Sequence, residues 1–271
     1  MIRWTRPCKL EEFLLPNENG LNWSLPLWME QKLEHEDTKR SYYACMLRRI
    51  VRLLGKDSNT VVEVRTQDTF GGSLLYDELI AKNGTKGAIA DNYETIFHDL
   101  FRMMFKPSPP VAKRIRKNLE ASQLVPGEYS VAHYRAFYGI ENEKEKRSSD
   151  ALISNAINAA NCASQLRPGG PVYFASDSKV ANEAVRHHAT VSNHSIVTFD
   201  SAEALHLDKG SGPPSDYYSV FVDLYLMGNG RCISYGQGGF GQFALLMSYN
   251  ATCMSRHFYK LKMQKCDWRD S

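Results

Sequence analysis

Hydrophobic and polar positions follow a regular pattern only in the second half of the chain. From residue 129 onward, short apolar runs typical of strands (YSVAHYR, VYFAS, SIVTF and RCISY) are separated by longer segments with helical spacing. Each run is nearly all apolar, as expected for strands buried on both faces of a parallel sheet. The pattern therefore predicts an α/β fold, in which helices cover both faces of a parallel sheet.

The helices expected around this sheet are bounded by caps and glycines. They begin near Ser149, Lys179 and Ser215, and a last one follows the glycine-rich stretch at 236–241. The first half is less regular: helical spacing is evident at 46–54 and 92–105, and VVEVR at 61–65 alternates like a strand. A further helix, with Ser108 as its cap, precedes the turn at 124–128. We place a domain boundary at this turn, which gives an N-terminal domain at 1–126, mostly helical, and a second domain at 127–271.

Composition narrows the class of protein only a little. The 271 residues are 43% hydrophobic and 23% charged with a net charge of +3, which is ordinary for a globular protein. The basic cluster at 113–117 lies off its helix's apolar stripe and has no aromatic residues between its charges. It is therefore interpreted as a solvated face, and no nucleic acid is expected as a partner. The chain as written has no signal peptide and no apolar run of the ~20 residues that span a membrane.

Cysteines and sequons bear on the compartment. The six cysteines include no CxxC pair and no zinc-type spacing, so no metal is expected, and both disulfides and free buried thiols remain open. Four Asn-x-Ser/Thr sequons, at Asn22, Asn83, Asn193 and Asn250, are a mild indication of the secretory pathway.

Candidate binding residues follow the predicted strands. In open parallel sheets, ligands bind beyond the carboxyl ends of the strands. His133 and Arg135 end the first strand two positions apart, so both project to one side, where a guanidinium can pair with a phosphate. The loop at 236–241 (GQGGFG) lies between a strand and a helix and could bind an anion through backbone N–H groups. Alternatively, Arg135 pairs with a surface carboxylate, His133 is structural, and the loop is merely flexible.

Three further acidic positions are candidates. Asp177 and Ser178 end VYFAS and could contact a ligand or cap the next helix, and Asp200 with Ser201 ends SIVTF. Asp223 interrupts an apolar helix and could face solvent or reach a base or ribose. The sequence contains neither a dinucleotide fingerprint nor a P-loop. It also contains no GxSxG elbow and no motif around a cysteine, so hydrolysis by a side-chain nucleophile has no support.

Four of these motifs, in order, resemble the fucosyltransferase-like glycosyltransferases, whose fold is the two-lobed, Rossmann-like GT-B type. The resemblance covers about 129–250 and rests on HYR, YFASDS, FVDLYLM and GQGGFGQFALLMS. The tail is also similar to fucosyltransferase-like sequences of algae, which end in a Cys and an Arg-His pair, as Cys253 and Arg256-His257 do here.

The resemblance implies a function and site residues. It implies a Rossmann-like lobe that transfers fucose from GDP-fucose to a glycan or protein hydroxyl without a metal or other cofactor, in the Golgi or endoplasmic reticulum lumen. Arg135 would hold the departing diphosphate and be the catalytic residue, and His133 would contact the nucleotide. Asp223 would contact the guanine or ribose, while Gly238, Gly239 and Phe240 would line the phosphates.

The sequence also departs from the family pattern. Ala136 follows the arginine where the family usually has a second basic residue, and the loop has glycines where the family has serines. Residues 1–60 lack the Gly-rich strand–loop–helix that opens the family's N-terminal, acceptor-side lobe, so this lobe is expected to be partial. Truncation of a longer, membrane-anchored protein would explain this. The alternative is a non-catalytic member that binds nucleotide or carbohydrate, and a nucleic-acid binder that uses 113–117 has less support.

Overall fold

The computed structural model of the chain divides into two compact units, each of which is described by itself. The smaller unit comprises residues 1–3 and 22–93, and the larger comprises 4–21 and 94–271. The structure describes residues 8–18, 20, 22, 39–43, 61–65, 93–136, 149–199, 212–236, 238–259 and 262–266. In the smaller unit, β2 (Lys39–Tyr43) pairs in parallel with β3 (Val61–Arg65), which is the strand predicted at 61–65. The helix predicted at 46–54 lies outside the described residues.

The larger unit is built on a five-stranded parallel sheet, as the alternating pattern predicts. Its strands are β5 (Ser130–Tyr134), β6 (Val172–Ser176), β7 (Ile196–Val197), β8 (Cys232–Tyr235) and β9 (Met254–Arg256), in the order β7-β6-β5-β8-β9. Every residue of β5, β6 and β8 is buried, which explains their nearly continuous apolar sequences. The α/β prediction is confirmed.

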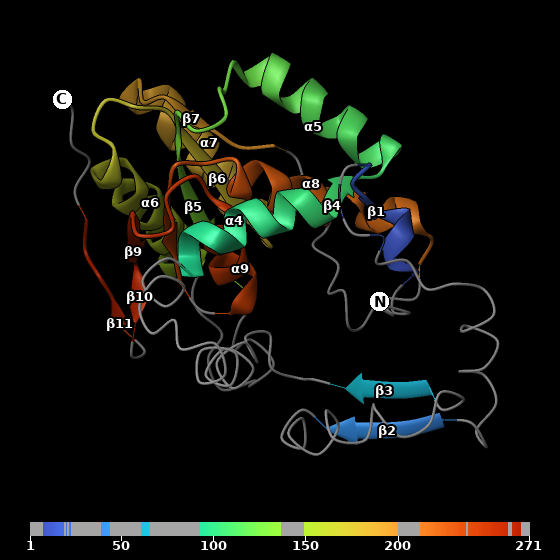
Figure 1. Cartoon of the computed structure of the whole chain (residues 1–271). Coiled ribbons are helices and arrows are strands. Elements are labelled where there is room, and N and C mark those ends of the chain that lie inside the picture. Colours follow the sequence, from blue (N-terminus) through green and yellow to red (C-terminus); the bar gives the residue numbers. More distant parts are fainter. Residues whose placement is uncertain are drawn as a thin grey trace. The chain divides into compact units, whose positions relative to one another are not determined.

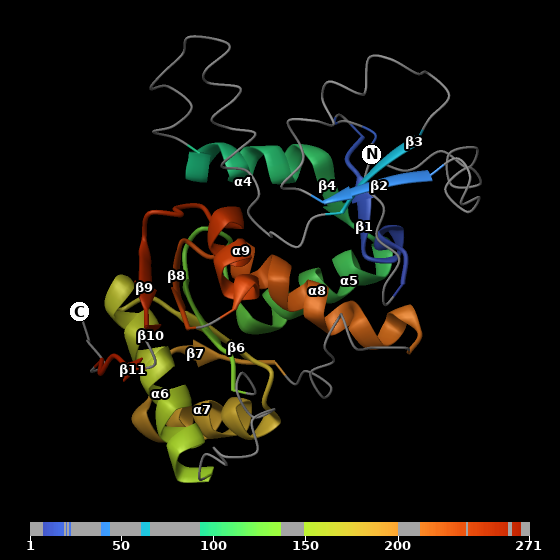
Figure 2. The ribbon, with the colours of Figure 1, turned by 90° about the horizontal axis from the view of Figure 1, so that it is seen from below.

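Helices cover both faces of this sheet (Figures 1 and 2). α6 (Ser149–Leu166) and α7 (Lys179–Ser192) cover one face, while α8 (Pro214–Gly228) and α9 (Gly239–Met247) cover the other. On the first face, Ala132 and Tyr134 of β5 pack with the alanines of α6, namely Ala156, Ala159, Ala160 and Ala163. Side chains alternate along a strand, so the next residue along, His133, projects to the α8/α9 face.

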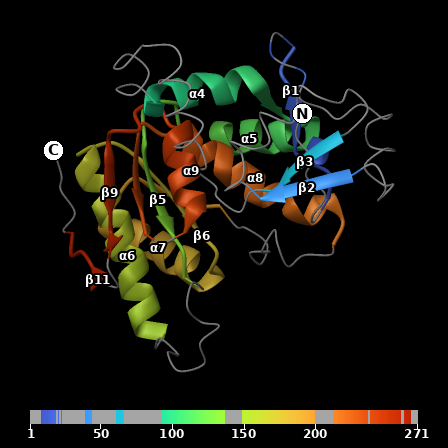
Figure 3. The same cartoon turned by 60° about the horizontal axis from the view of Figure 1, so that its bottom comes forward.

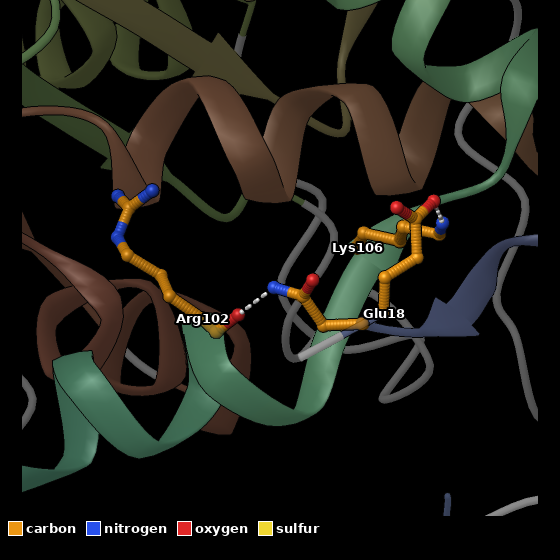
Figure 4. Close-up of polar contacts among 4 residues, drawn as sticks. Glu18, Arg102 and Lys106 are labelled. Carbon is orange, nitrogen blue, oxygen red and sulfur yellow. Dashed lines mark hydrogen bonds and ion pairs between the residues drawn. The ribbon is translucent and has the colours of Figure 1, made fainter. Parts of the chain in front are cut away.

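A further layer lies over α8 and α9. It contains α4 (Tyr93–Met104) and α5 (Pro109–Ser122), with an antiparallel pair formed by β1 (Leu14–Pro16) and β4 (Phe105–Pro107). Polar contacts flank this pair: Lys106 forms an ion pair with Glu18 at 2.6 Å, and the Arg102 carbonyl accepts a hydrogen bond from Asn17 at 2.8 Å (Figure 4). Ser108 stands at the N-cap of α5 as predicted, but its hydroxyl donates to the Glu12 carbonyl.

Two disulfides fix the C-terminal segment to the sheet unit. Cys162 of α6 pairs with Cys266, and Cys232 of β8 pairs with Cys253 just before β9. These pairs resolve the question that the sequence leaves open for four of the cysteines. Cys8 is a free thiol, and Cys45 lies outside the described residues. The short hairpin of β10 (Phe258–Tyr259) and β11 (Lys262–Met263) lies between the two C-terminal cysteines.

The structure adds three details to the predicted pattern. Of SIVTF, only Ile196 and Val197 pair in the sheet, as β7, and no pattern in the sequence predicts β9. The predicted domain boundary near residue 126 falls inside the larger unit, because α5, which precedes it, packs against α8. Within the described helices, none is long and apolar enough to cross a membrane.

Candidate functional site

The direction of the chain through the sheet reverses between β5 and β8, and a ligand crevice is expected beyond the carboxyl ends of these two strands. From β5 the chain proceeds to β6 on one side, and it returns later to β8 on the other side. This reversal is a topological switch point, where ligands of open α/β sheets bind beyond the strands' carboxyl ends. Arg135 directly follows β5, and the glycine-rich stretch directly follows β8. Two of the predicted clusters therefore meet at this crevice.

Arg135 lies against the N-terminus of α9. The helix begins at Gly239, and its N-cap Gly238 has a φ of 92°, a backbone conformation that favours glycine. A Cβ added at Gly238 would lie 3.4 Å from Cδ of Arg135. The first N–H groups of a helix have no intrahelical partner and carry a partial positive charge. The Arg135 side chain and these donors thus lie side by side, and this combination suits a phosphate or diphosphate.

α9 lies beside β5 (Figure 3). His133 of β5 lies on the face that α9 covers: its ring centroid is 5.4 Å from that of Phe240, and a Cβ at Gly241 would come within 2.7 Å of its Nδ1. Glycine at 241 is therefore what allows α9 to approach β5. The Nδ1 atom is buried and has no hydrogen-bond partner among the described residues. Burial, with a smaller contribution from the Arg135 charge, lowers the pKa of His133 to about 4, so its imidazole is neutral at neutral pH.

A second buried histidine, His257, adjoins this group. It is fully buried after β9, and its Nδ1 lies 3.0 Å from the hydroxyl of Ser234. Burial first, and then His133, lower the pKa of His257 to about 3. In the sequence, His257 is noted only because the tail is similar to algal fucosyltransferase-like sequences, and no pattern predicts that it lies near His133. The proximity of the two histidines depends on β9, whose three residues carry no apolar run.

Asp177 and Ser178 are both engaged within the fold. The backbone N–H of Ala136 donates to Asp177 at 2.6 Å, which joins the exits of β5 and β6. The Ser178 hydroxyl accepts from Ala181 N–H at 3.3 Å and caps α7. The capping alternative is thus present, and contact of either side chain with a ligand stays a prediction. Asp200 and Ser201 lie outside the described residues.

Asp223 belongs to a pocket between α5 and α8. Its Oδ1 accepts a hydrogen bond of 2.8 Å from the Tyr173 hydroxyl of β6, and burial raises the pKa of the Asp223 carboxyl to about 6. The pocket has a volume of about 290 Å³. It is lined from α8 by Ser219, Val222 and Asp223, from α5 by Arg114, Lys117 and Asn118, and by Phe199, two residues after β7.

The pocket and the crevice lie on the same face of the sheet. Tyr173 pairs in register with Val131, two residues before His133 on β5. Strand geometry therefore places Tyr173 about 7 Å along the strands and one strand (~4.8 Å) away from His133. One extended ligand could reach both places. The described residues contain no group of three His, Cys, Asp or Glu side chains that could hold a metal ion.

Comparisons with known proteins identify the fold. No protein-family model matches the sequence, and no curated protein matches it. Among solved structures, the chain is similar to a mutant of the fucosyltransferase FUT1 of Arabidopsis thaliana in complex with GDP, with 15% identity and a TM-score of 0.55. The match covers 88% of this chain and 60% of that one, so this chain spans less than two thirds of its neighbour. At this identity the likeness shows the Rossmann-like α/β fold.

Proposed function

We propose that the larger unit binds a nucleoside diphosphate sugar and transfers its sugar to a hydroxyl group. In this proposal the donor is GDP-fucose and the acceptor is a glycan or protein, and neither a metal nor another cofactor takes part. Arg135 and the N-terminus of α9, at Gly238, Gly239 and Phe240, hold the diphosphate. His133 contacts the nucleotide, and Asp223 contacts its base or ribose.

The observation that carries this proposal is the position of Arg135 against α9 at the switch point. Two positive features, a guanidinium and a helix N-terminus, are held together by the close approach at Gly238. They are adjoined by the buried imidazole of His133, whose Nδ1 has no hydrogen-bond partner among the described residues. Because the imidazole of His133 is neutral, it adds a hydrogen-bonding group and no charge. Such a set of groups suits a dianionic diphosphate with a polar nucleoside attached.

The same groups fit the chemistry of glycosyl transfer. The bond between sugar C1 and the diphosphate oxygen breaks and leaves its electron pair on the diphosphate, while C1 bonds to the acceptor oxygen, which releases its proton to water. Negative charge grows on the departing diphosphate during this step. Arg135 and the α9 N–H groups are already oriented there, so they stabilise the transition state without reorganising. The GDP complex of the structural neighbour, which has the same fold, supports this choice of ligand.

The disulfides support a secretory location for this activity. Disulfides persist in oxidising compartments and are rare in the cytosol. Cys162–Cys266 and Cys232–Cys253 are both formed. Described sequon residues are also surface-accessible: Asn22 and Asn193 are exposed, and Asn250 is partly exposed. We therefore propose the Golgi or endoplasmic reticulum lumen as the place of action.

Replacement of Arg135 tests the proposal. The wild-type protein should bind GDP and GDP-fucose, measured by calorimetry and by the rise in melting temperature with ligand. Arg135→Ala should weaken GDP binding about 10- to 100-fold, because a charge-assisted contact to the diphosphate is lost. Transfer of fucose to acceptors should fall at least as much.

The control is Arg116→Ala, which removes an exposed arginine of α5 that does not line the pocket. It should leave GDP binding unchanged. Equal GDP affinity in Arg135→Ala and the wild type would refute the proposed site. GDP binding that depends on Arg135, without transfer to any acceptor in a glycan array, would favour the non-catalytic alternative.

A further inference from the structure

The basic cluster of α5 is divided between the pocket and the solvent. All four basic side chains are exposed, but only Arg114 and Lys117, together with Asn118, line the pocket. Residues three and four apart share one face of a helix, which explains this division. A solvated face therefore accounts fully for Lys113 and Arg116, whereas Arg114 and Lys117 also line a pocket.

The pocket has walls of opposite chemical character. On the α8 side, the Asp223 carboxylate is held by the Tyr173 hydroxyl and accepts hydrogen bonds. On the α5 side, Arg114 and Lys117 can only donate them. The Arg114 guanidinium carbon lies 5.2 Å from the centroid of the Tyr218 ring, and this cation–π contact holds the arginine side chain in place. Phe199 adds an aromatic surface, with its ring 5.9 Å from that of Tyr173.

This pattern of donors and acceptors distinguishes nucleobases. Guanine presents acceptors at O6 and N7 and donors at N1 and N2, and arginine or lysine paired with O6 and N7 is its commonest specific contact. Adenine presents an amino donor where guanine has O6, which Arg114 and Lys117 could not accept. A planar base could also lie against the Phe199 ring. A cavity of about 290 Å³ is close to the usual range for small-ligand sites.

We propose that Arg114 and Lys117 are specificity-determining residues that select guanine through its O6 and N7 atoms. The Asp223 carboxylate accepts from the donors on the other side of the base. This inference rests on the proposed function, because the base must belong to the nucleotide whose diphosphate lies at Arg135. It assigns to α5 a role in binding that neither the fold nor the motifs assign.

The test compares three nucleotides and two double variants. Dissociation constants for GDP, ADP and UDP are measured by calorimetry on the full chain. The wild type should bind GDP at least tenfold more tightly than ADP or UDP. Arg114→Ala/Lys117→Ala should lose about 10- to 100-fold in GDP affinity, the scale of one lost bidentate base contact. Its affinities for ADP and UDP should change less than threefold.

Lys113→Ala/Arg116→Ala is the matched control, since it removes the same charge from the same helix outside the pocket. It should keep the preference for GDP. All four replaced side chains are exposed, so both double variants should fold, which circular dichroism and melting temperature check.

The outcomes separate the two proposals. A wild type that binds none of the three nucleotides refutes the proposed function, and this inference with it. A wild type that binds all three equally refutes only the guanine selection. Retained preference for GDP in Arg114→Ala/Lys117→Ala, or an equal loss for all three nucleotides in both double variants, also refutes it. The last result would mean that α5 attracts the diphosphate through charge alone.

Discussion

At the scale of single residues, the crevice contains two buried imidazoles that resist protonation. His133 and His257 have pKa values of about 4 and 3 because burial disfavours their charged forms. Asp223 is the opposite case, because burial raises the pKa of its carboxyl to about 6. Each group lowers the free energy of unfolding in the pH range in which it is charged in the unfolded chain but neutral in the folded protein.

The sign of the histidine contribution gives a prediction. Below the ordinary histidine pKa of about 6.5, the unfolded chain binds protons that the folded protein does not, so stability falls as the pH drops from about 6.5 toward 4. His257→Asn should remove part of this loss, so its melting temperature should decline less over that range than that of the wild type. Differential scanning calorimetry at half-unit pH steps measures it.

The slope with pH, rather than the absolute melting temperature, is the readout, because the substitution itself disturbs a buried site. Asp223 has the opposite effect: because the pKa of its carboxyl is raised in the folded protein, the free energy of unfolding falls as the pH rises toward 6. Asp223 is present in both proteins, so its effect cancels in the comparison. His187→Asn, on the exposed face of α7, is the control. Parallel pH profiles for His257→Asn and the wild type would contradict the assignment.

At the scale of elements, α4 is attached to the ends of two helices by one polar cluster. Arg102 donates to Asn229 Oδ1 at 2.9 Å, to the Gly228 carbonyl at 3.3 Å and to His98 Nε2 at 3.0 Å, and it lies over the Tyr249 ring. Because His98 Nε2 accepts, its Nδ1 carries the proton and donates to the Met247 carbonyl at 2.7 Å. Carbonyls at the C-termini of α8 and α9 are satisfied in this way.

Arg102→Met should therefore destabilise the protein by roughly 2 kcal/mol, because the buried acceptors at Gly228 and Asn229 lose a charged donor. Methionine keeps much of the apolar stem, which limits the loss of packing. Urea unfolding measures the change. Arg116→Met, on the exposed face of α5, should change the free energy of unfolding by no more than about 0.5 kcal/mol. An equally small effect of Arg102→Met would show that packing alone holds α4.

Elements also show where sequence reasoning succeeds and where it ends. Strands β5, β6 and β8 were predicted because burial on both faces makes them apolar throughout. β9 has no such signal, since the sequence Met-Ser-Arg becomes a strand only by pairing with β8. The meeting of Arg135 with α9 follows from the order of strands, whereas the pocket at Asp223 depends on α5 packing over α8. Helical periodicity gives the apolar face of α5 but not what lies opposite its polar face.

At the scale of the whole molecule, the two disulfides close loops of different length. Cys162–Cys266 spans 104 residues and Cys232–Cys253 spans 21. In the chain-entropy account, a longer closed loop removes more freedom from the unfolded chain. Both bonds fix the C-terminal segment, one through α6 and the other at the start of β8.

Cys162→Ser/Cys266→Ser should consequently lower stability by about 4 to 5 kcal/mol, and Cys232→Ser/Cys253→Ser by about 3 kcal/mol. Guanidinium unfolding under non-reducing conditions compares them. Dithiothreitol should lower the melting temperature of the wild type and have much less effect on a protein lacking both bonds. Recovery of other cysteine pairs from non-reducing peptide mass spectrometry would overturn the assignment.

The central position of β5 has a consequence for biosynthesis. Its partner β8 and the glycine turn beside Arg135 follow roughly a hundred residues later in the chain, so about 5 to 20 s of translation separate them. Until β8 has been synthesised, the nascent chain has one unpaired edge of β5, which can associate with other chains. The proposed diphosphate site cannot assist early folding, because it forms only when β8 and α9 have been synthesised. A nucleotide in the surrounding medium would therefore act as a late folding aid, stabilising the chain only after α9 has emerged.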